Sequence, residues 1–382
     1  MRMLPAGPLL HRATAKRNPI ARRLLAHTTR RRLNLDPAPS NPPRNPRITT
    51  PRSQPQPPPP SSPPPPPTTR LTTTPSSPKW PPLPLPPPEI TPLHPKLTRI
   101  LASNPSKFTL QGTNTYLLGA GATRLLIDTG EGKPAWLSAL KAHLAAENAT
   151  LLHVLLTHRH HDHVGGVADV RAAWPGATVW KCEPEDGEEE IVDGARWHLP
   201  EAQVTLRAVH TPGHTSDHMC FVWEEEGAVF TGDNVLGHGT SVFEDLGAYV
   251  ASLERMRGLF AGGRGITGRA YPGHGEVVED GRGRVEEYIR HRAQREEQVV
   301  QTLRGRGQEG VETTSGAGGG GDGSWAVMEL VASIYRDVPE SLHPAAAGGV
   351  VQILQKLLRE GKAVVEGDGE RWRLTGSGRS AL

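Results

Sequence analysis

The sequence has few cysteines, no long apolar segment, and almost no acidic residues in its first quarter. Only Cys182 and Cys220 occur among 382 residues, which excludes a disulfide scaffold and any zinc or iron–sulfur site built from several cysteines. No apolar run approaches the ~18–20 residues needed to cross a bilayer, so no membrane association is expected. Residues 1–100 contain two acids, Asp36 and Glu89, against 16 Lys and Arg, a net charge of +14. Residues 101–382 carry 27 Lys and Arg against 38 Asp and Glu, so an overall charge of +3 conceals an acidic body of −11.

The basic N-terminal segment is also rich in proline. Residues 1–100 contain 29 of the 38 prolines. A segment with this composition cannot bury enough apolar surface to offset the entropy lost on ordering, so residues 1–88 are predicted to be disordered. Residues 1–35 are rich in Arg and contain no acid, as in a mitochondrial transit peptide, and a disordered basic tail or a mispredicted gene start is an equal alternative. We therefore expect an intracellular protein, in the cytoplasm or the mitochondrial matrix.

The remaining sequence alternates between predicted strands and helices. Short apolar runs bounded by glycine predict strands, and longer amphipathic runs predict helices. The order predicts an α/β or α+β sandwich over residues 89–305. The glycine-rich residues 306–324 are predicted to form a linker. Residues 325–382 are predicted to hold helices at 325–335 and 345–359 and a hairpin at 363–374, an arrangement similar to a winged helix.

A dense cluster of histidines follows a predicted buried strand at residues 151–156. The residues at 158–163 read HRHHDH, and two glycines come shortly after them. Imidazoles with one carboxylate suit Zn²⁺ or a similar ion. His158 and His160 can converge on one ion, and Asp162 and His163 can reach a second.

Three later residues complete a candidate site. His214 lies in HTPGHTSDH, Asp233 in FTGDN and His274 in YPGHG, each near a predicted strand end and flanked by glycine. Such turns let the backbone approach an ion closely. His238, in VLGHGT, is the best candidate to protonate a leaving group or contact the substrate, and a loop histidine fixed by packing is an equal alternative. The acidic residues 183–190 lack the ligand spacing of a calcium loop and are predicted to be solvated.

With NPSKFTLQGTNTYLLG, LLIDTGEG and GHGTSVFEDL, these motifs make residues 95–300 resemble the metallo-β-lactamase superfamily. Within it, they are similar to the β-lactamase-like-protein-2 group, which includes animal mitochondrial endoribonucleases and fungal thioesterases that release polyketides from acyl-carrier proteins. The segment WAVMELVASIY extends the resemblance to about residue 375. The resemblance implies an αββα sandwich with the metal site at one edge of the two sheets, followed by a small winged-helix-like domain.

The resemblance also implies two zinc ions per chain. The implied ligands are His158, His160 and His214 for one ion, Asp162, His163 and His274 for the other, and Asp233 as a bridge. His161 falls at a variable position and is not expected to be a ligand. Asp128 is expected to orient a metal-bound imidazole. Asp217 and His218 are expected to fix their loop by hydrogen bonds. Arg159 stands where relatives often carry an aromatic residue.

The implied activity is hydrolysis by a hydroxide held between the two ions. Asp162, Asp233 and His238 are the residues expected to act in catalysis. The acidic body favours an acyl thioester on an acyl-carrier protein or CoA-like carrier, in polyketide biosynthesis, because nucleic-acid affinity depends mainly on basic residues that neutralise phosphates. The alternative is an endoribonuclease acting on single-stranded RNA. A non-catalytic binding protein on a degenerate fold is disfavoured, because every implied ligand position is filled.

Overall fold

The structure is a computed structural model that describes residues 89–260, 268–308, 323–367 and 370–376. The predicted N-terminal segment, residues 1–88, lies outside the described residues, as does most of the predicted linker. The described residues all belong to one compact unit. None of the described helices combines the length and the apolar character that crossing a membrane requires.

The first of two stacked sheets has seven strands in sequential order. Their bounds are β1 Ile90–His94, β2 Leu97–Leu101, β3 Asn114–Leu118, β4 Thr123–Ile127, β5 Thr150–Leu155, β6 Thr178–Lys181 and β7 Glu189–Glu190. Strands β1 to β4 pair antiparallel, whereas β4 to β7 pair parallel. Parallel neighbours need crossover connections, and helices α2 (Pro134–Ala146) and α4 (Val167–Ala173) lie in two of them.

The second sheet has five strands in the order β12-β11-β10-β9-β8. Their bounds are β8 Arg196–Leu199, β9 Val204–His210, β10 Met219–Trp223, β11 Ala228–Gly232 and β12 Ala270–Pro272. Strands β8 to β11 pair antiparallel, and β12 joins β11 in parallel. Every residue of β10, β11 and β12 is buried, as expected of strands that are covered on both faces.

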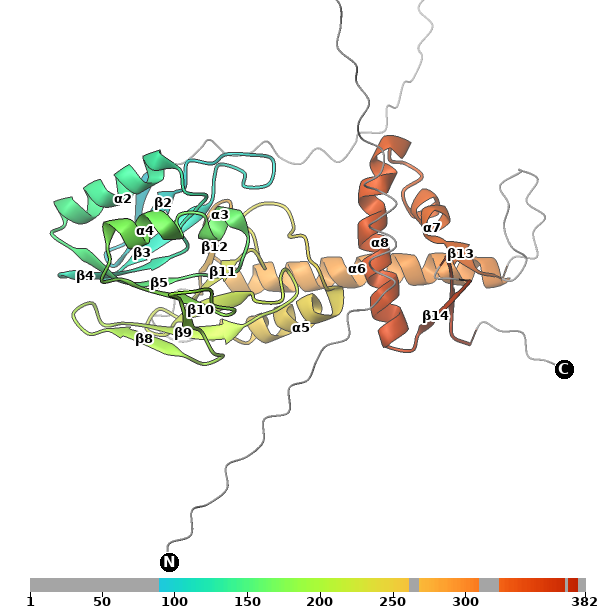
Figure 1. Ribbon diagram of the computed structural model, residues 1–382. Helices are drawn as coiled ribbons and strands as arrows, with labels where there is room; N and C mark the ends of the chain where they lie inside the picture. Colours follow the sequence, from blue (N-terminus) through green and yellow to red (C-terminus); the bar gives the residue numbers. More distant parts are fainter. Residues whose placement is uncertain (1–88, 261–267, 309–322, 368–369, 377–382) are drawn as a thin grey trace, which may run out of the picture. The chain divides into compact units, whose positions relative to one another are not determined.

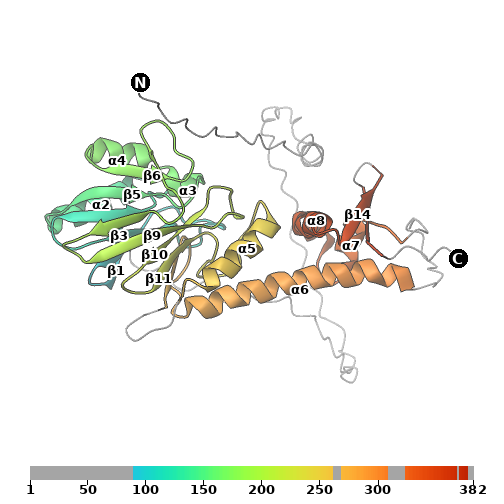
Figure 2. The ribbon, with the colours of Figure 1, turned by 90° about the horizontal axis from the view of Figure 1, so that it is seen from below.

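Alternating side chains of the strands fill three apolar layers. In β3, Tyr116 and Leu118 point into the core between the sheets, together with Phe221 of the second sheet. Leu117 between them points to the outer face and packs in the same cluster as Trp136 of α2. The outer face of the second sheet forms the third cluster with helices α5 (Leu246–Arg257) and α6 (Gly281–Gln308). Figures 1 and 2 show α2 and α4 on one side of the paired sheets and α5 on the other. The αββα sandwich implied by the sequence is confirmed.

The C-terminal part forms a small three-stranded sheet with two helices. Its elements are β13 Trp325–Ala326, α7 Val327–Ile334, the single 3-10 turn η1 Glu340–Leu342, α8 His343–Arg359, β14 Ala363–Glu366 and β15 Arg371–Leu374. The strand order is β13-β15-β14. The predicted winged-helix arrangement of two helices followed by a hairpin is confirmed. Its buried residues belong to the same apolar cluster as Val299 and Leu303 of α6.

Several elements differ from the sequence-based expectation. The helix predicted at residues 325–335 begins at Val327, because Trp325 and Ala326 pair with β15. Helix α6 is longer than the predicted residues 285–303 and passes residue 305, where a domain boundary was placed. Its first turn is stabilised by Asp280, whose carboxylate accepts a hydrogen bond from the Gly283 N–H as N-cap residues do.

The acidic run at residues 183–190 is not wholly a loop, because its last two residues form β7 beside β6. Most of the side chains of this run are exposed, as predicted. Among the described residues, the groups of side chains that could hold a metal ion all lie elsewhere.

Candidate metal centre

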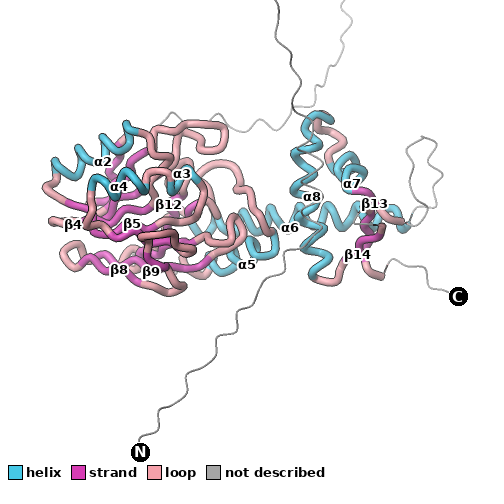
Figure 3. Tube along the Cα trace, in the orientation of Figure 1, coloured by secondary structure: helices cyan, strands magenta, loops and turns pink. Residues whose placement is uncertain are grey.

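The histidine-rich segment leaves the end of β5 and turns into α3 (His161–Val164). His158 and His163 are completely buried, whereas His160 and Asp162 are half-buried and His161 is exposed. The turn brings four side chains of the HRHHDH run, those of His158, His160, Asp162 and His163, toward the two groups of candidate ligands. Figure 3 shows long loops at the end of the sandwich nearest α3.

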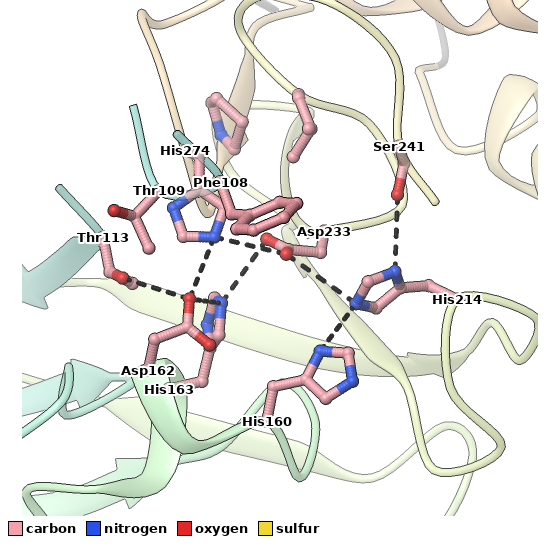
Figure 4. A network of polar contacts seen from close by, with 12 residues as sticks. Phe108, Thr109, Thr113, His160, Asp162, His163, His214, Asp233, Ser241 and His274 are labelled. Atoms are coloured by element: carbon pink, nitrogen blue, oxygen red, sulfur yellow. Dashed lines mark hydrogen bonds and ion pairs between the residues drawn. The ribbon is translucent and has the colours of Figure 1, made fainter. Parts of the chain in front are cut away.

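The other three candidate ligands come from the second sheet. His214 lies between β9 and β10, Asp233 directly follows β11, and His274 follows β12. All three are buried, with exposed fractions of 3%, 8% and 3% respectively. Together with four residues of the motif after β5, they form two groups. The first group is His158, His160, His214 and Asp233, and the second is Asp162, His163 and His274. Within each group the possible ligand atoms all lie within 4.8 Å of one another. The structure therefore brings together all seven residues that were predicted to bind metal. Figure 4 labels six of them, all except His158.

Three histidine nitrogens form a nearly equilateral triangle in the first group. His160 Nδ1 lies 3.0 Å from His158 Nε2 and 3.0 Å from His214 Nε2. The third side, between His158 Nε2 and His214 Nε2, measures 3.2 Å. Three ligands at the corners of a tetrahedron around zinc, with bonds of about 2.05 Å, would be about 3.3 Å apart. The triangle therefore has the size of one face of a zinc coordination shell.

Asp233 lies between this triangle and the second group. Its Oδ2 is 3.7 Å from His214 Nε2 and 3.2 Å from His274 Nε2. Its Oδ1 is 3.4 Å from His163 Nε2. Asp162 Oδ2 lies 3.2 Å from His274 Nε2 and 3.5 Å from His163 Nε2. Asp233 is thus the carboxylate that reaches residues of both groups, which is the position expected of a bridging ligand.

Hydrogen bonds on the far side of the rings fix which nitrogen carries the proton. Asp128 Oδ2 lies 2.7 Å from His163 Nδ1 and also accepts from the Thr157 hydroxyl at 2.9 Å. Because that hydroxyl donates to Asp128, it accepts from His158 Nδ1, which lies 2.9 Å away. The Val242 carbonyl lies 2.8 Å from Nδ1 of His214 and can only accept. In all three rings Nδ1 carries the outward-facing proton, so Nε2 faces the centre and is the nitrogen available to a metal ion.

This arrangement fits a cation. Nε2 of His158 and Nε2 of His214 lie 3.2 Å apart, and a proton on Nδ1 of His160 could be donated to only one of them. Nε2 of His163 and Oδ1 of Asp233 are buried and have no hydrogen-bond partner among the described residues. Buried polar atoms without a hydrogen-bond partner are costly, and a divalent ion would bind both of these atoms. The fold therefore presents a His/Asp cluster that can bind metal.

The charges of the cluster are strongly coupled. Burial lowers the pKa of His158 well below its usual value, which keeps this ring neutral and ready to bind metal. Burial acts against the charge on Asp233, yet the neighbouring His274 and His163 hold its pKa well below the usual value. Burial likewise opposes the charge on Asp162, but His274 and His163 lower its pKa to about 2. The centre therefore contains two carboxylates that stay ionised at neutral pH.

Glycine is required where β12 approaches the centre. A Cβ atom at Gly273 would run into the Asp233 carboxylate and the His163 ring. Its absence lets the backbone of β12 pass beside β11, so that the Gly273 N–H donates to the Gly232 carbonyl at 2.9 Å. The glycine thus allows His274 to reach the same space as Asp233.

Two residues at the start of β3 support the centre and were not predicted individually. Thr113 Oγ1 lies 3.4 Å from Asp162 Oδ2. The side-chain amide of Asn114 donates to the carbonyls of Pro272 and Gly275, each at 2.9 Å, and so fixes the turn that carries His274. The only sequence signal was the polar GTNT stretch within a motif that contributed to the family resemblance. The partner of Thr113 lies 49 residues later in the chain and those of Asn114 lie 158 and 161 residues later, beyond any local pattern.

Asp217, His218 and Arg159 hold the loops around the centre. As expected, Asp217 and His218 act through hydrogen bonds. Asp217 accepts from Arg159 at 3.0 Å, and His218 Nε2 accepts from the Asp233 N–H at 3.2 Å. Arg159 also reaches Glu244 in the loop before α5. It thus ties the motif after β5 to two loops of the second sheet.

His161 and His238 lie outside the two groups of candidate ligands. His161 is exposed and opens α3. His238 is half-buried and follows Gly237, whose N–H donates to the His274 carbonyl at 2.9 Å. The backbone of His238 is therefore close to a candidate ligand, and its role in catalysis stays a prediction.

Two family models match the sequence in keeping with this architecture. The metallo-beta-lactamase superfamily matches residues 108–274, and the beta-lactamase associated winged helix domain matches residues 326–372. The chain belongs to the metallo-β-lactamase superfamily and is an enzyme of the hydrolase type.

Curated relatives match over most of their length. Lactamase-like protein adaB of Aspergillus niger is 43% identical over 292 residues, which cover 75% of this chain and 89% of the relative. Atrochrysone carboxyl ACP thioesterase of Aspergillus chevalieri is 42% identical over 304 residues, which cover 78% of this chain and 91% of the relative. Among solved structures, a metallo-beta-lactamase family protein from Thermus thermophilus shares the fold with a TM-score of 0.54 and 25% identity, covering 74% of this chain and all of that one.

Proposed function

We propose that this protein is a zinc-dependent thioesterase with two metal ions per chain, acting on an acyl group carried by an acyl-carrier protein. The observation that carries the hydrolase part is the convergence of seven His and Asp residues, of which His158, His163 and His214 have outward-facing Nδ1 protons. The thioester part is supported by two relatives named atrochrysone carboxyl ACP thioesterase, from Aspergillus chevalieri and Cryptosporiopsis, which are 42% and 41% identical to this chain. A role in polyketide biosynthesis would follow from the same relatives.

Each part of the cluster has a defined role in this proposal. The first ion would be held by His158, His160 and His214, the second by Asp162, His163 and His274, with Asp233 shared by both. Bound divalent ions of this kind supply a nucleophile from water at neutral pH and polarise the carbonyl group that is attacked.

The residues of the chain supply orientation and charge. Asp128 and Thr157 hold the imidazoles in the tautomer that binds metal. The ionised Asp233 and Asp162 offset the positive charge that the centre would carry. A thiolate is a good leaving group and needs no strong acid to protonate it. The role proposed for His238 is therefore a minor one, to contact or protonate the leaving group. No serine or cysteine nucleophile is needed for this reaction.

The experiment compares substrates on the full-length protein. The purified chain, stripped with a chelator and then reconstituted with zinc, is assayed on an acyl group loaded on a phosphopantetheinylated carrier protein and on a single-stranded RNA. Zinc-dependent thioester hydrolysis with intact RNA is expected. Asp233→Ala should be inactive, and the matched variant His161→Ala should be active. RNA cleavage without thioester hydrolysis would contradict the proposal.

A further inference from the structure

The loop between β11 and α5 carries one candidate ligand and binds the ring of another. It begins at Asp233, and its Val242 carbonyl accepts from His214 Nδ1 at 2.8 Å. The Ser241 hydroxyl donates to the same carbonyl at 2.9 Å. A displacement of this loop would therefore move the acceptor that orients the His214 ring.

The middle of the loop is held by contacts with α6. Residues 233–245 are all described and form no helix or strand, so they lack the regular backbone hydrogen bonds of those elements. Arg292 of α6 donates to the Ser241 carbonyl at 2.8 Å. Arg284 of the same helix donates to the Gly239 carbonyl at 2.9 Å. The position of the loop thus depends on side chains from other elements.

The end of the loop is bonded to both segments that supply histidines to the first group. The N–H groups of Glu244 and Asp245 donate to the Gly213 carbonyl at 2.8 Å and 3.1 Å, directly before His214. The Glu244 carboxylate binds Arg159, which stands between two candidate ligands in the HRHHDH run. These two acidic residues therefore connect the loop to the ligand segments from both sheets.

Helix α8 of the C-terminal part binds the same two acidic residues. Arg359 donates to the two carboxylate oxygens of Asp245 at 2.6 Å and 2.9 Å. The side-chain amide of Gln352 donates to the Glu244 carbonyl at 2.9 Å. Gln352 and Arg359 are about two helical turns apart, so they lie on one face of α8. Both belong to the segment that matches the winged-helix model, which is thus joined to the metal centre by a continuous series of bonds.

We propose that α8 sets the zinc affinity of the first group, with Arg359 and Gln352 as positioning residues that act through Asp245 and Glu244. The inference rests on the proposed metal-dependent function and identifies a determinant of the centre that lies outside it. Ligands that are held in the binding geometry lose less conformational freedom when an ion binds. Without the bonds from α8, the backbone before His214 would gain freedom, and the affinity for zinc would fall.

The test measures zinc affinity of the full-length protein by competition with a chelator. In Arg359→Ala, one of the two zinc dissociation constants should rise about fivefold, and the other should stay within about twofold. Arg359→Lys, which keeps the charge, and Gln352→Ala should each give a rise of about twofold. In a His160→Ala background, which lacks a ligand of the first group, Arg359→Ala should have no further effect on the remaining ion.

Turnover of a carrier-bound thioester gives a second readout. At limiting zinc, Arg359→Ala should lower kcat and leave KM within about twofold, because fewer molecules hold both ions. Excess zinc should restore kcat to the wild-type value. A wild type that binds zinc but hydrolyses no thioester would contradict the proposed function alone, because the chelator competition tests the role of α8 without turnover.

Lys356→Ala is the matched control, because Lys356 is a cation of the same helix that pairs with Glu296 of α6 and with Glu360. It should leave both zinc dissociation constants unchanged. Urea denaturation of the metal-free proteins should show no larger loss of stability in Arg359→Ala than in Lys356→Ala, because the Arg359 side chain is 52% exposed and that of Lys356 is 12% exposed. Unchanged zinc affinity in Arg359→Ala, or the same loss in Lys356→Ala, would overturn the inference.

Discussion

Arg159 and Glu244 form a two-point ion pair, in which Nη2 of the arginine lies 2.6 Å and 2.7 Å from the two carboxylate oxygens. The other terminal nitrogen, Nη1, binds Asp217 at 3.0 Å. The two acids differ in environment, because the Asp217 side chain is fully buried and the Glu244 side chain is half exposed. The Arg159 guanidinium thus binds one carboxylate that is exposed to solvent, that of Glu244, and one that is buried, that of Asp217.

We predict that Arg159→Ala destabilises the protein by about 2 kcal/mol, because it leaves the buried Asp217 carboxylate without its cation. Glu244→Ala should cost less than about 1 kcal/mol, because exposed ion pairs contribute little. Urea denaturation of both variants measures the two free energies of unfolding. Equal losses of unfolding free energy in the two variants would show that the ion pair with Asp217 stabilises the protein no more than the ion pair with Glu244.

Asp128→Asn should weaken metal binding by about 10- to 100-fold. The amide would lose the negative charge that accepts the Nδ1 proton of His163 and the hydroxyl proton of Thr157. Asn is the suitable replacement because Asp128 has φ +60°, a left-handed conformation that Asn tolerates better than most residues. Zinc affinity is measured by competition with a chelator. An unchanged affinity would exclude a role of Asp128 in orienting the ligands.

Asp233→Ala should lose metal from both groups and abolish turnover, because one carboxylate is removed from between them. Asp233→Asn keeps the size of the side chain and removes its charge, so this variant should also lose metal and turnover. His161→Ala should retain wild-type metal content, since its exposed ring lies outside both groups. Elemental analysis of the three purified variants decides the result. Two metals and normal turnover in Asp233→Ala would rule out the bridging role, and metal loss in His161→Ala would show a wrong register of the motif.

Deletion of residues 1–88 should leave hydrolysis intact. The cut should keep Glu89, because its carbonyl accepts from the Leu101 N–H at 2.8 Å and holds the start of the first sheet. The measured quantities are kcat and KM on a carrier-bound thioester, together with the soluble yield. A large loss of either turnover or solubility would show that the basic segment contributes to the enzyme.

The candidate ligands could be identified from the sequence because each is marked locally. Four lie within one run of six residues, and His214, Asp233 and His274 each combine a strand end with glycine. The supporting contacts have no such mark. The bond from Asn114 to Gly275 joins segments that are 161 residues apart, and nothing around Arg159 indicates Glu244 as its partner. Local patterns identify residue types at strand ends, whereas pairing between distant loops depends on the whole fold.

The strands were predicted unevenly for a similar reason. Strand β5 (Thr150–Leu155) lies within one residue at each end of the strand predicted at residues 151–156, because its sequence is mostly apolar. Strands β1, β2 and β8 were missed, because polar or charged residues interrupt them. Arg99 in β2 is only 2% exposed, so a charged residue that reads as surface is in fact buried in the sheet. Its burial depends on Glu276, 3.6 Å away in the turn after His274, which no local pattern could indicate.

The apolar cluster of α6 has a consequence for how the protein unfolds. The cluster contains Val229 of the second sheet, Val299 of α6 and Leu357 of α8 as parts of one contiguous interior. The segments that match two separate family models therefore do not have two independent cores. Heating should melt the described residues in a single cooperative transition, and the winged-helix segment expressed alone should expose the apolar faces that α6 covers. The sandwich and the C-terminal winged-helix part are therefore expected to fold and unfold as one unit.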